Sequence, residues 1–101
     1  MTPPLPTRSE WLDAIARDPM VSPTAFRAAW ALSRMVRANG KLSGRMVEIA
    51  AACGTSETTC RSMVFRLAER GYLSCKLERG RVTIQIAATI PKRKLSAPVA
   101  A

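Results

Sequence analysis

The segment 57–70 carries the side chains best suited to contact a polar, charged ligand. Its apolar residues recur with helical spacing and predict one buried stripe, made of Cys60, Met63, Val64 and Leu67. The residues expected to face outward are Glu57, Thr58, Arg61, Ser62 and Phe65. Arginine can donate two hydrogen bonds to one guanine, and hydroxyl groups can contact base edges or phosphates. This face therefore predicts hydrogen bonding in the major groove of a nucleic acid.

Arg61 is the best candidate for reading a base because it lies at the centre of this face, the alternative being a solvated surface side chain. Glu57 can accept a hydrogen bond from cytosine or repel phosphate, but a favourable charge at a helix N-terminus explains it equally well. Phe65 has three interpretations: packing beneath a neighbouring hairpin, contact with a thymine methyl group, or contact with a second chain. Arg66 and Arg70 lie further along, where phosphate contact is expected.

A second helix must precede this one, joined to it by a tight turn. Gly54 allows the chain to reverse within a few residues, and Ser56 can cap the helix that follows. Ser43 and Arg45 are expected to begin the preceding helix, whose first backbone amides can hold a phosphate. Two helices joined in this way form a helix-turn-helix.

A β-hairpin is predicted directly after the helix-turn-helix. Residues 72–77 and 82–87 alternate between apolar and polar side chains, and a turn at 78–81 separates them. The hairpin tip carries Arg79 and Arg81. They predict contact with a minor groove or its phosphates, although a basic, soluble turn would look the same.

Two helices are expected before this unit, followed by a short extended link. The expected elements are a helix over 10–17 capped by Ser9, a helix over 23–38 capped by Ser22 and closed by Asn39–Gly40, and the link Lys41–Leu42. Trp11, Phe26 and Trp30 have helical spacing and are expected in the core or at an interface. The first helix is too short to fold alone. It either caps its own domain or joins two copies through Trp11, Leu12 and Ile15.

Composition supports a nucleic-acid partner. The chain has 101 residues, enough for one small domain, and a net charge of +9. Residues 1–20 hold two arginines against three acidic residues, so the excess of positive charge lies entirely in the rest of the chain. A concentrated positive field favours a polyanion, although a solvated basic surface is the alternative.

Several classes of site lack the residues that they need. There is no histidine and no C-x-x-C pair, so we expect no metal site and no cofactor. Cys53, Cys60 and Cys75 are expected as free thiols in a reducing, cytoplasmic compartment. There is no phosphate-binding loop and no convincing acid pair, so an enzyme is not expected. No segment approaches the roughly 20 apolar residues that span a membrane.

From about residue 23 to 88, the chain resembles the winged helix-turn-helix superfamily, especially the small domains of bacterial, phage and plasmid regulators and replication initiators. Ile49–Ala50, Cys53–Gly54 and Ser56 fit the turn motif, and Leu67, Gly71, Tyr72 and Leu73 fit the segment after it. The resemblance implies a mainly α domain with a small β-hairpin (α+β) over 9–90, with an extra N-terminal helix. It would lie between a disordered segment 1–8 and a basic flexible tail, 91–101.

The resemblance also implies a function. The chain is expected to bind double-stranded DNA sequence-specifically, probing the major groove with helix 57–70 and using the basic wing at 78–81. The expected DNA-binding residues are Ser43, Arg45, Ser56, Glu57, Thr58, Arg61, Ser62, Arg66, Arg79 and Arg81. A transcription regulator is the first expectation. An architectural, excisionase-like or replication-initiation factor of a mobile element and a domain used only for protein contact are alternatives. A homodimer or DNA-templated oligomer is expected, with no membrane and no small-molecule ligand.

Overall fold

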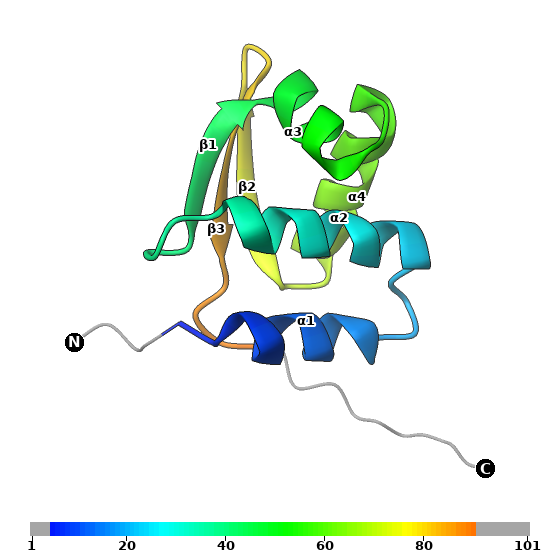
Figure 1. Ribbon diagram of the computed structural model, residues 1–101, viewed down its shortest axis with the longest axis vertical. Helices are drawn as coiled ribbons and strands as arrows, with labels where there is room; N and C mark the ends of the chain where they lie inside the picture. The colour runs from blue at the N-terminus through cyan, green and yellow to red at the C-terminus, as the bar shows by residue number, and fades with distance from the viewer. Residues whose placement is uncertain (1–4, 91–101) are drawn as a thin grey trace.

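A computed structural model describes residues 5–90, which form an α+β domain of helices packed beside a small sheet (Figure 1). Its elements are α1 (Arg8–Ala16), α2 (Pro23–Met35), β1 (Lys41–Arg45), α3 (Met46–Cys53), α4 (Glu57–Glu69), β2 (Leu73–Glu78) and β3 (Arg81–Ile86). The mainly α layout with a β-hairpin matches the expectation from the sequence. The predicted basic tail, 91–101, lies outside the described residues. Within 5–90, no helix combines the length and the apolar character required to cross a bilayer.

The sheet is antiparallel, with the order β1-β3-β2. Its central strand, β3, buries Val82, Ile84 and Ile86 and exposes Arg81 and Thr83. This alternation places the apolar side chains on the face that packs against the helices and the polar ones on the outer face. The sheet therefore contributes one half of the core and keeps a polar surface on its other side.

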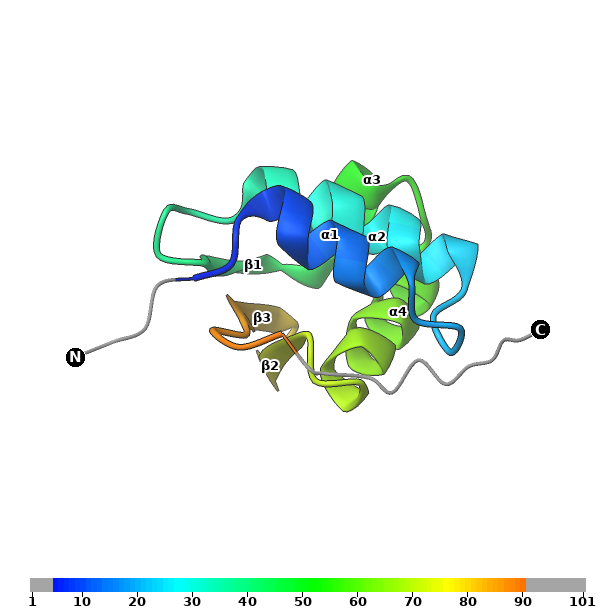
Figure 2. The same cartoon turned by 90° about the horizontal axis from the view of Figure 1, so that it is seen from below.

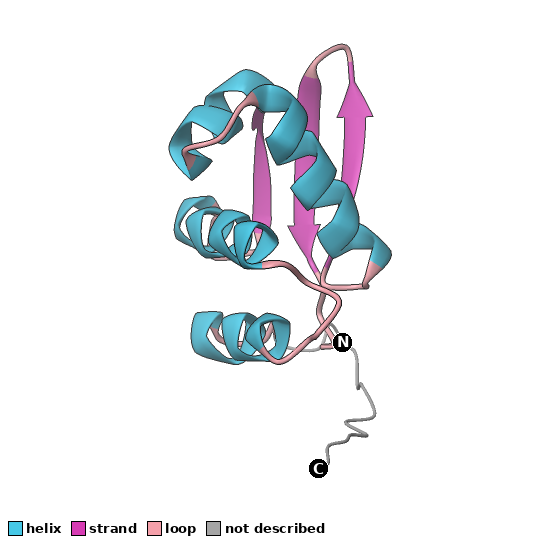
Figure 3. Cartoon of the chain, turned by 90° about the vertical axis from the view of Figure 1, so that its right-hand side faces the viewer, coloured by secondary structure: helices cyan, strands magenta, loops and turns pink. Residues whose placement is uncertain are grey.

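The helices form layers beside the sheet. Figure 2 shows α1 lying alongside α2, and in Figure 3 α1, α2 and α3 follow one another from bottom to top. Helix α2 contacts α1, α3 and α4, so it is the centre of the helical layer. Its small buried residues, Ala25, Ala28 and Ala29, allow this close approach from several sides. The β2–β3 turn lies beside α3, at the end of the molecule opposite α1 (Figure 1).

Helix α1 is held against its own domain by buried side chains. Trp11 and Ile15 are 2% and 1% exposed, and the Trp11 indole N–H donates a 2.8 Å hydrogen bond to the backbone carbonyl of Tyr72. These two residues are therefore not available for contact with a second chain. The expected dimer stays a prediction, but Trp11 and Ile15 would not form its interface. Phe26 is half-buried, but Trp30 is 46% exposed, so of the two expected positions, in the core or at an interface, only the interface remains for Trp30.

The start of α1 differs from the sequence prediction. Thr7, rather than Ser9, caps the helix: its side chain accepts a 3.1 Å hydrogen bond from the Glu10 N–H, and the Glu10 carboxylate accepts one of 2.8 Å from the Thr7 N–H. This reciprocal arrangement is a capping box, which satisfies two otherwise free donors. Thr7 and Arg8 therefore belong to the folded domain, although the sequence analysis assigned them to a disordered segment, 1–8.

The region after α2 also differs. The helix ends at Met35 rather than near Ala38, because Val36 is already extended and residues 37–41 form a turn. Gly40 serves that turn with φ of 78° and does not cap the helix. A Cβ at Gly40 would lie 2.8 Å from the Leu5 side chain, so glycine also makes room for the N-terminal segment. The expected short link is the five-residue strand β1.

Candidate nucleic-acid interface

The turn between α3 and α4 is built from Gly54, Thr55 and Ser56. Gly54 has φ of 73°, in the left-handed region that favours glycine, and ends α3. The Ser56 hydroxyl accepts a 3.1 Å hydrogen bond from the Thr59 N–H and lies 3.0 Å from the Thr59 hydroxyl. Ser56 therefore caps α4, as the sequence predicted. With its hydroxyl engaged by Thr59, it is a weaker candidate for contact with a nucleic acid than the residues that follow.

Helix α4 has the two faces that its sequence predicted. Cys60, Val64 and Leu67 are buried, and Met63 is half-buried. On the other side, Glu57, Thr58 and Ser62 are exposed, and none of their side chains contributes to the core. Phe65 is 43% exposed, which disfavours the first of its three interpretations, packing beneath the hairpin, and its ring adds apolar surface to the outer face.

Arg61 is oriented by its neighbour one turn earlier. A guanidinium nitrogen of Arg61 lies 3.1 Å from a carboxylate oxygen of Glu57, and the two side chains are 41% and 44% exposed. An exposed pair at this spacing is worth only about 0.5 kcal/mol. Arg61 Nε is buried and has no hydrogen-bond partner among residues 5–90. Glu57 therefore holds Arg61 close to the helix in a pair weak enough to open when a competing acceptor arrives.

The hairpin tip is a tight turn that displays arginine. Arg79 and Gly80, between β2 and β3, have φ of 50° and 79°, the positive values of a type I′ turn. A positive φ is unusual for arginine. Arg79 and Arg81 are both exposed, and neither forms an ion pair within the described residues. The local strain and the free charges are consistent with a binding role for this turn.

Ser43 and Arg45 lie in β1, so the prediction that they begin α3 was wrong for Ser43, whereas Arg45, the last residue of β1, is also the N-cap residue of α3. Ser43 is paired with Thr83, and Arg45 is paired with Arg81 on the central strand. The physical reason is that β1 completes the sheet through backbone hydrogen bonds to β3, which a helical conformation at 41–45 would lose. The consequence is a new grouping: Arg45 stands directly opposite Arg81, and Glu78 stands opposite Arg81 on its other side. Like charges in this position repel, and Glu78 offsets part of that repulsion.

The hairpin tip is also attached to the helix-turn-helix. The N–H of Met46, the first residue of α3, donates a 3.0 Å hydrogen bond to the carbonyl of Gly80. Because this bond occupies an amide at the start of α3, the expected phosphate site there has lost one of its donors. The same hydrogen bond holds the hairpin tip, with Arg79 and Arg81, beside Arg45 and the first turn of α3.

Lys76 belongs to the same surface and was missed in the sequence. It is exposed on the outer face of β2 and pairs with Thr83, which in turn pairs with Ser43. The alternation of β2 indicated which way Lys76 points, but the order of the strands, which the sequence does not reveal, was needed to place it beside Ser43. The outer face of the sheet therefore extends the basic surface away from the hairpin tip.

Two arginines near the end of α4 are engaged elsewhere. Arg66 lies 3.1 Å from Glu69 in an exposed pair and remains available to a stronger acceptor. Arg70 donates two 2.9 Å hydrogen bonds to the Asp18 carboxylate, which also accepts a 2.8 Å bond from the Tyr72 hydroxyl. Asp18 is only 3% exposed. The expected phosphate contact by Arg70 is therefore replaced by a structural role.

The environment of Asp18 stabilises its charged form. Burial alone would raise the pKa of this carboxyl group, but the hydrogen bonds from Arg70, from the backbone N–H of Met20 and from Tyr72 outweigh it. The pKa falls from 3.8 to about 2. Asp18 thus stays ionised at neutral pH and joins the segment after α1 to the end of α4.

Within the described residues, the arginine-bearing β2–β3 turn is bonded to the start of α3, and α4 packs against α3 after the Gly54 turn. The cysteines take no part in the candidate interface, since Cys53 and Cys60 are buried and Cys75 is half-buried, all as free thiols. Basic side chains with hydroxyl groups between them suit an extended polyanion. The chain matches no protein-family model, no curated protein and no solved structure in the comparisons made.

Proposed function

We propose that the chain is a winged helix-turn-helix protein that binds double-stranded DNA sequence-specifically as a transcription regulator. The observation that carries this proposal is the arrangement of α3, its tight turn and α4 beside the β2–β3 hairpin, with β1 pairing to β3. In this superfamily, the second helix of the turn unit reads the major groove and the hairpin reaches the adjacent backbone. The basic residues of the domain support the same orientation.

In the proposed complex, α4 enters the major groove by its exposed face. Thr58 and Ser62 contact base edges or phosphates, and Arg61 leaves Glu57 to bond a guanine. The β2–β3 turn places Arg79 and Arg81 on the flanking phosphates, and Arg45 follows them because it pairs with Arg81. Glu57 repels phosphate at incorrectly placed sites and so contributes to discrimination.

Replacement of Arg61 by alanine tests the reading of a base. We expect affinity for the preferred site to fall by about 1–3 kcal/mol, with preference relaxed at one base pair, because a bidentate contact is lost. The measurement is a binding titration on the selected site and on each single-base variant of it. The matched variant Glu57→Gln releases Arg61 without removing it, and we expect it to raise affinity for random DNA. An equal loss on preferred and random DNA for Arg61→Ala would contradict a reading role.

Replacement of the two arginines of the hairpin tip tests the backbone contact. Asn tolerates the positive φ of Arg79, so the double variant Arg79→Asn, Arg81→Thr removes charge without adding strain. We expect weaker binding to all DNA and a salt dependence shallower by up to about two units, because two counterions fewer are released. The control is Arg17→Ala, a basic residue directly after α1 that is paired with Asp13. A salt dependence that does not change in the double variant would remove the tip from the interface.

Selection of bound sequences from random DNA, followed by footprinting, tests the function itself. A single protected operator next to a promoter supports a regulator, whereas an array of sites with bending supports an architectural role in recombination or replication. Mass measurement on the selected site reports how many copies bind. Absence of any sequence enrichment, with no salt-sensitive shift of duplex DNA, would contradict the proposal as a whole.

A further inference from the structure

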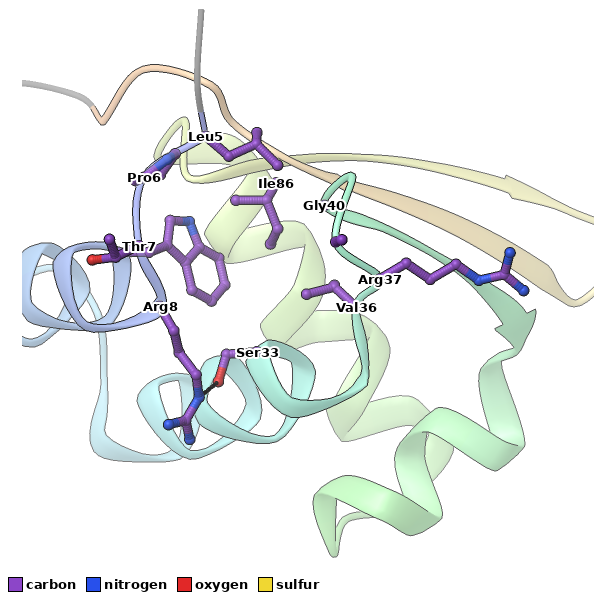
Figure 4. Close-up of a pocket in the computed structure, with 11 residues that line it drawn as sticks. Leu5, Pro6, Thr7, Arg8, Ser33, Val36, Arg37, Gly40 and Ile86 are labelled. Carbon is purple, nitrogen blue, oxygen red and sulfur yellow. Dashed lines mark hydrogen bonds between the residues drawn. The ribbon is translucent and has the colours of Figure 1, made fainter.

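An open pocket of about 460 Å³ lies between α1, the end of α2 and the sheet (Figure 4). Its apolar lining comes from residues far apart in the sequence: Leu5, Pro6, Trp11, Val36 and Ile86. The volume is within the range of sites that hold small ligands or an anchoring side chain, roughly 300–1,000 Å³. Helix α1, which contributes Arg8 and Trp11 to the lining, lies at the end of the domain opposite the β2–β3 turn (Figure 1).

Arginine side chains leave this pocket in different directions. Arg37 extends from the end of α2, and Arg8 runs to the Ser33 hydroxyl, to which its Nε donates a 2.8 Å hydrogen bond (Figure 4). Ser33 in turn donates a 2.6 Å bond to the backbone carbonyl of Trp30. These two hydrogen bonds fix the Arg8 guanidinium on the surface between α1 and α2, at the edge of the pocket nearest Trp30.

Trp30 is the apolar centre of that surface. The side chain is 46% exposed, and the guanidinium carbons of Arg34 and Arg8 lie 5.1 and 5.6 Å from the centroid of its ring. Cation–π contact of this kind orders both the ring and the charges. We call the pocket together with Arg8, Trp30, Arg34 and Arg37 the α1–α2 patch.

The arginines of the α1–α2 patch are not neutralised within the domain. Neither Arg8 nor Arg34 nor Arg37 forms an ion pair with a carboxylate in residues 5–90. The patch therefore combines an apolar recess, a half-exposed tryptophan and three guanidinium groups that no carboxylate of the described residues neutralises. Tryptophan and arginine are the residue types most enriched in the energetically important centres of protein interfaces.

We propose that the α1–α2 patch binds an acidic segment of another protein, which inserts one apolar side chain into the pocket and places carboxylates on Arg8, Arg34 and Arg37. The chain's own termini lack this chemistry: residues 1–4 contain no acidic residue, and 91–101 contain three basic residues and no acidic one. A nucleic acid fits less well, because two guanidinium groups already lie over the Trp30 ring, where a base would have to stack. The domain can then hold DNA and a protein partner on separate surfaces.

The test uses the full chain and three fluorescent probes of equal length: an acidic peptide of Glu and Asp with one central Leu, the same peptide with Ser in place of Leu, and oligodeoxythymidine. Binding is followed by anisotropy. We expect the Leu peptide to bind at least tenfold more tightly than the Ser peptide. We expect the double variant Arg8→Ala, Arg37→Ala and the single variant Trp30→Ala each to weaken that binding at least tenfold.

The control variant is Arg79→Asn, Arg81→Thr, which removes the same charge from the hairpin tip and leaves binding of the Leu peptide within twofold. Equal losses in the two double variants would show attraction by net charge alone and overturn the proposal. So would equal binding of the two peptides, or oligodeoxythymidine binding that is lost on Arg8→Ala, Arg37→Ala, which would assign the patch to a nucleic acid. Sedimentation of the free chain as a dimer that Trp30→Ala dissociates would assign it to a second copy. Thermal melting confirms that every variant is folded.

Discussion

Truncation of Trp11 to alanine is expected to lower the free energy of unfolding by about 3–5 kcal/mol. The indole is buried between α1 and the sheet and donates to the Tyr72 carbonyl, so alanine leaves a cavity and removes one of the two hydrogen bonds that this carbonyl accepts, the other coming from the Ala87 N–H. A domain of this size has a total stability of the order of 5–15 kcal/mol, so the loss is a large part of it. Urea unfolding followed by circular dichroism measures the change.

Trp30→Ala is the matched control, because it removes the same side chain from α2 at a half-exposed position. We expect its effect on stability to stay within about 1 kcal/mol, the range of an exposed cation–π contact. Similar losses for the two variants would mean that α1 does not pack against the domain as the structure has it. The same reasoning makes deletion of residues 1–18 a poor test of self-association, because the deletion also removes Trp11, Ile15 and Asp18 from the fold.

Replacement of Asp18 by asparagine is expected to lower stability by about 3 kcal/mol at neutral pH. Loss of one partner from a buried ion pair typically costs about 3–5 kcal/mol, and the lower end applies because Arg70 is 24% exposed and regains some hydration. Asp13→Asn is the control, since Asp13 pairs with Arg17 at 3.2 Å on the surface and such pairs contribute little. Equal destabilisation by the two variants would contradict the structural role of Asp18.

The pH dependence of stability follows from the same carboxylate. Its pKa is lowered from 3.8 to about 2 in the folded protein, so its contribution is complete above about pH 5 and is lost as the pH falls towards 2. The lowered pKa corresponds to about 2 kcal/mol. Between pH 6 and pH 2, the wild-type chain should therefore lose about 2 kcal/mol more than Asp18→Asn. Parallel pH curves for the two proteins would contradict the assignment.

Local sequence determined the parts of the fold that depend on local interactions. The period of apolar residues in α4 indicated which side is buried, because side chains three and four positions apart share a helix face. Gly54 and Ser56 marked the turn, since one accepts a left-handed conformation and the other supplies a cap to a free N–H. The alternation in β2 and β3 likewise predicted a hairpin with exposed Arg79 and Arg81.

Contacts between distant segments decided the rest. Ser43 and Arg45 were expected at the start of a helix but lie in β1, because the backbone hydrogen bonds of this edge strand come from its partner β3, which is distant in the sequence. Arg70 resembled a phosphate contact until Asp18, 52 positions away, was brought beside it. Trp11 and Trp30 have the same residue type and helical surroundings, yet only Trp11 is buried. Burial depends on which helix face meets the sheet, and the packing of α1 on α2 sets that face.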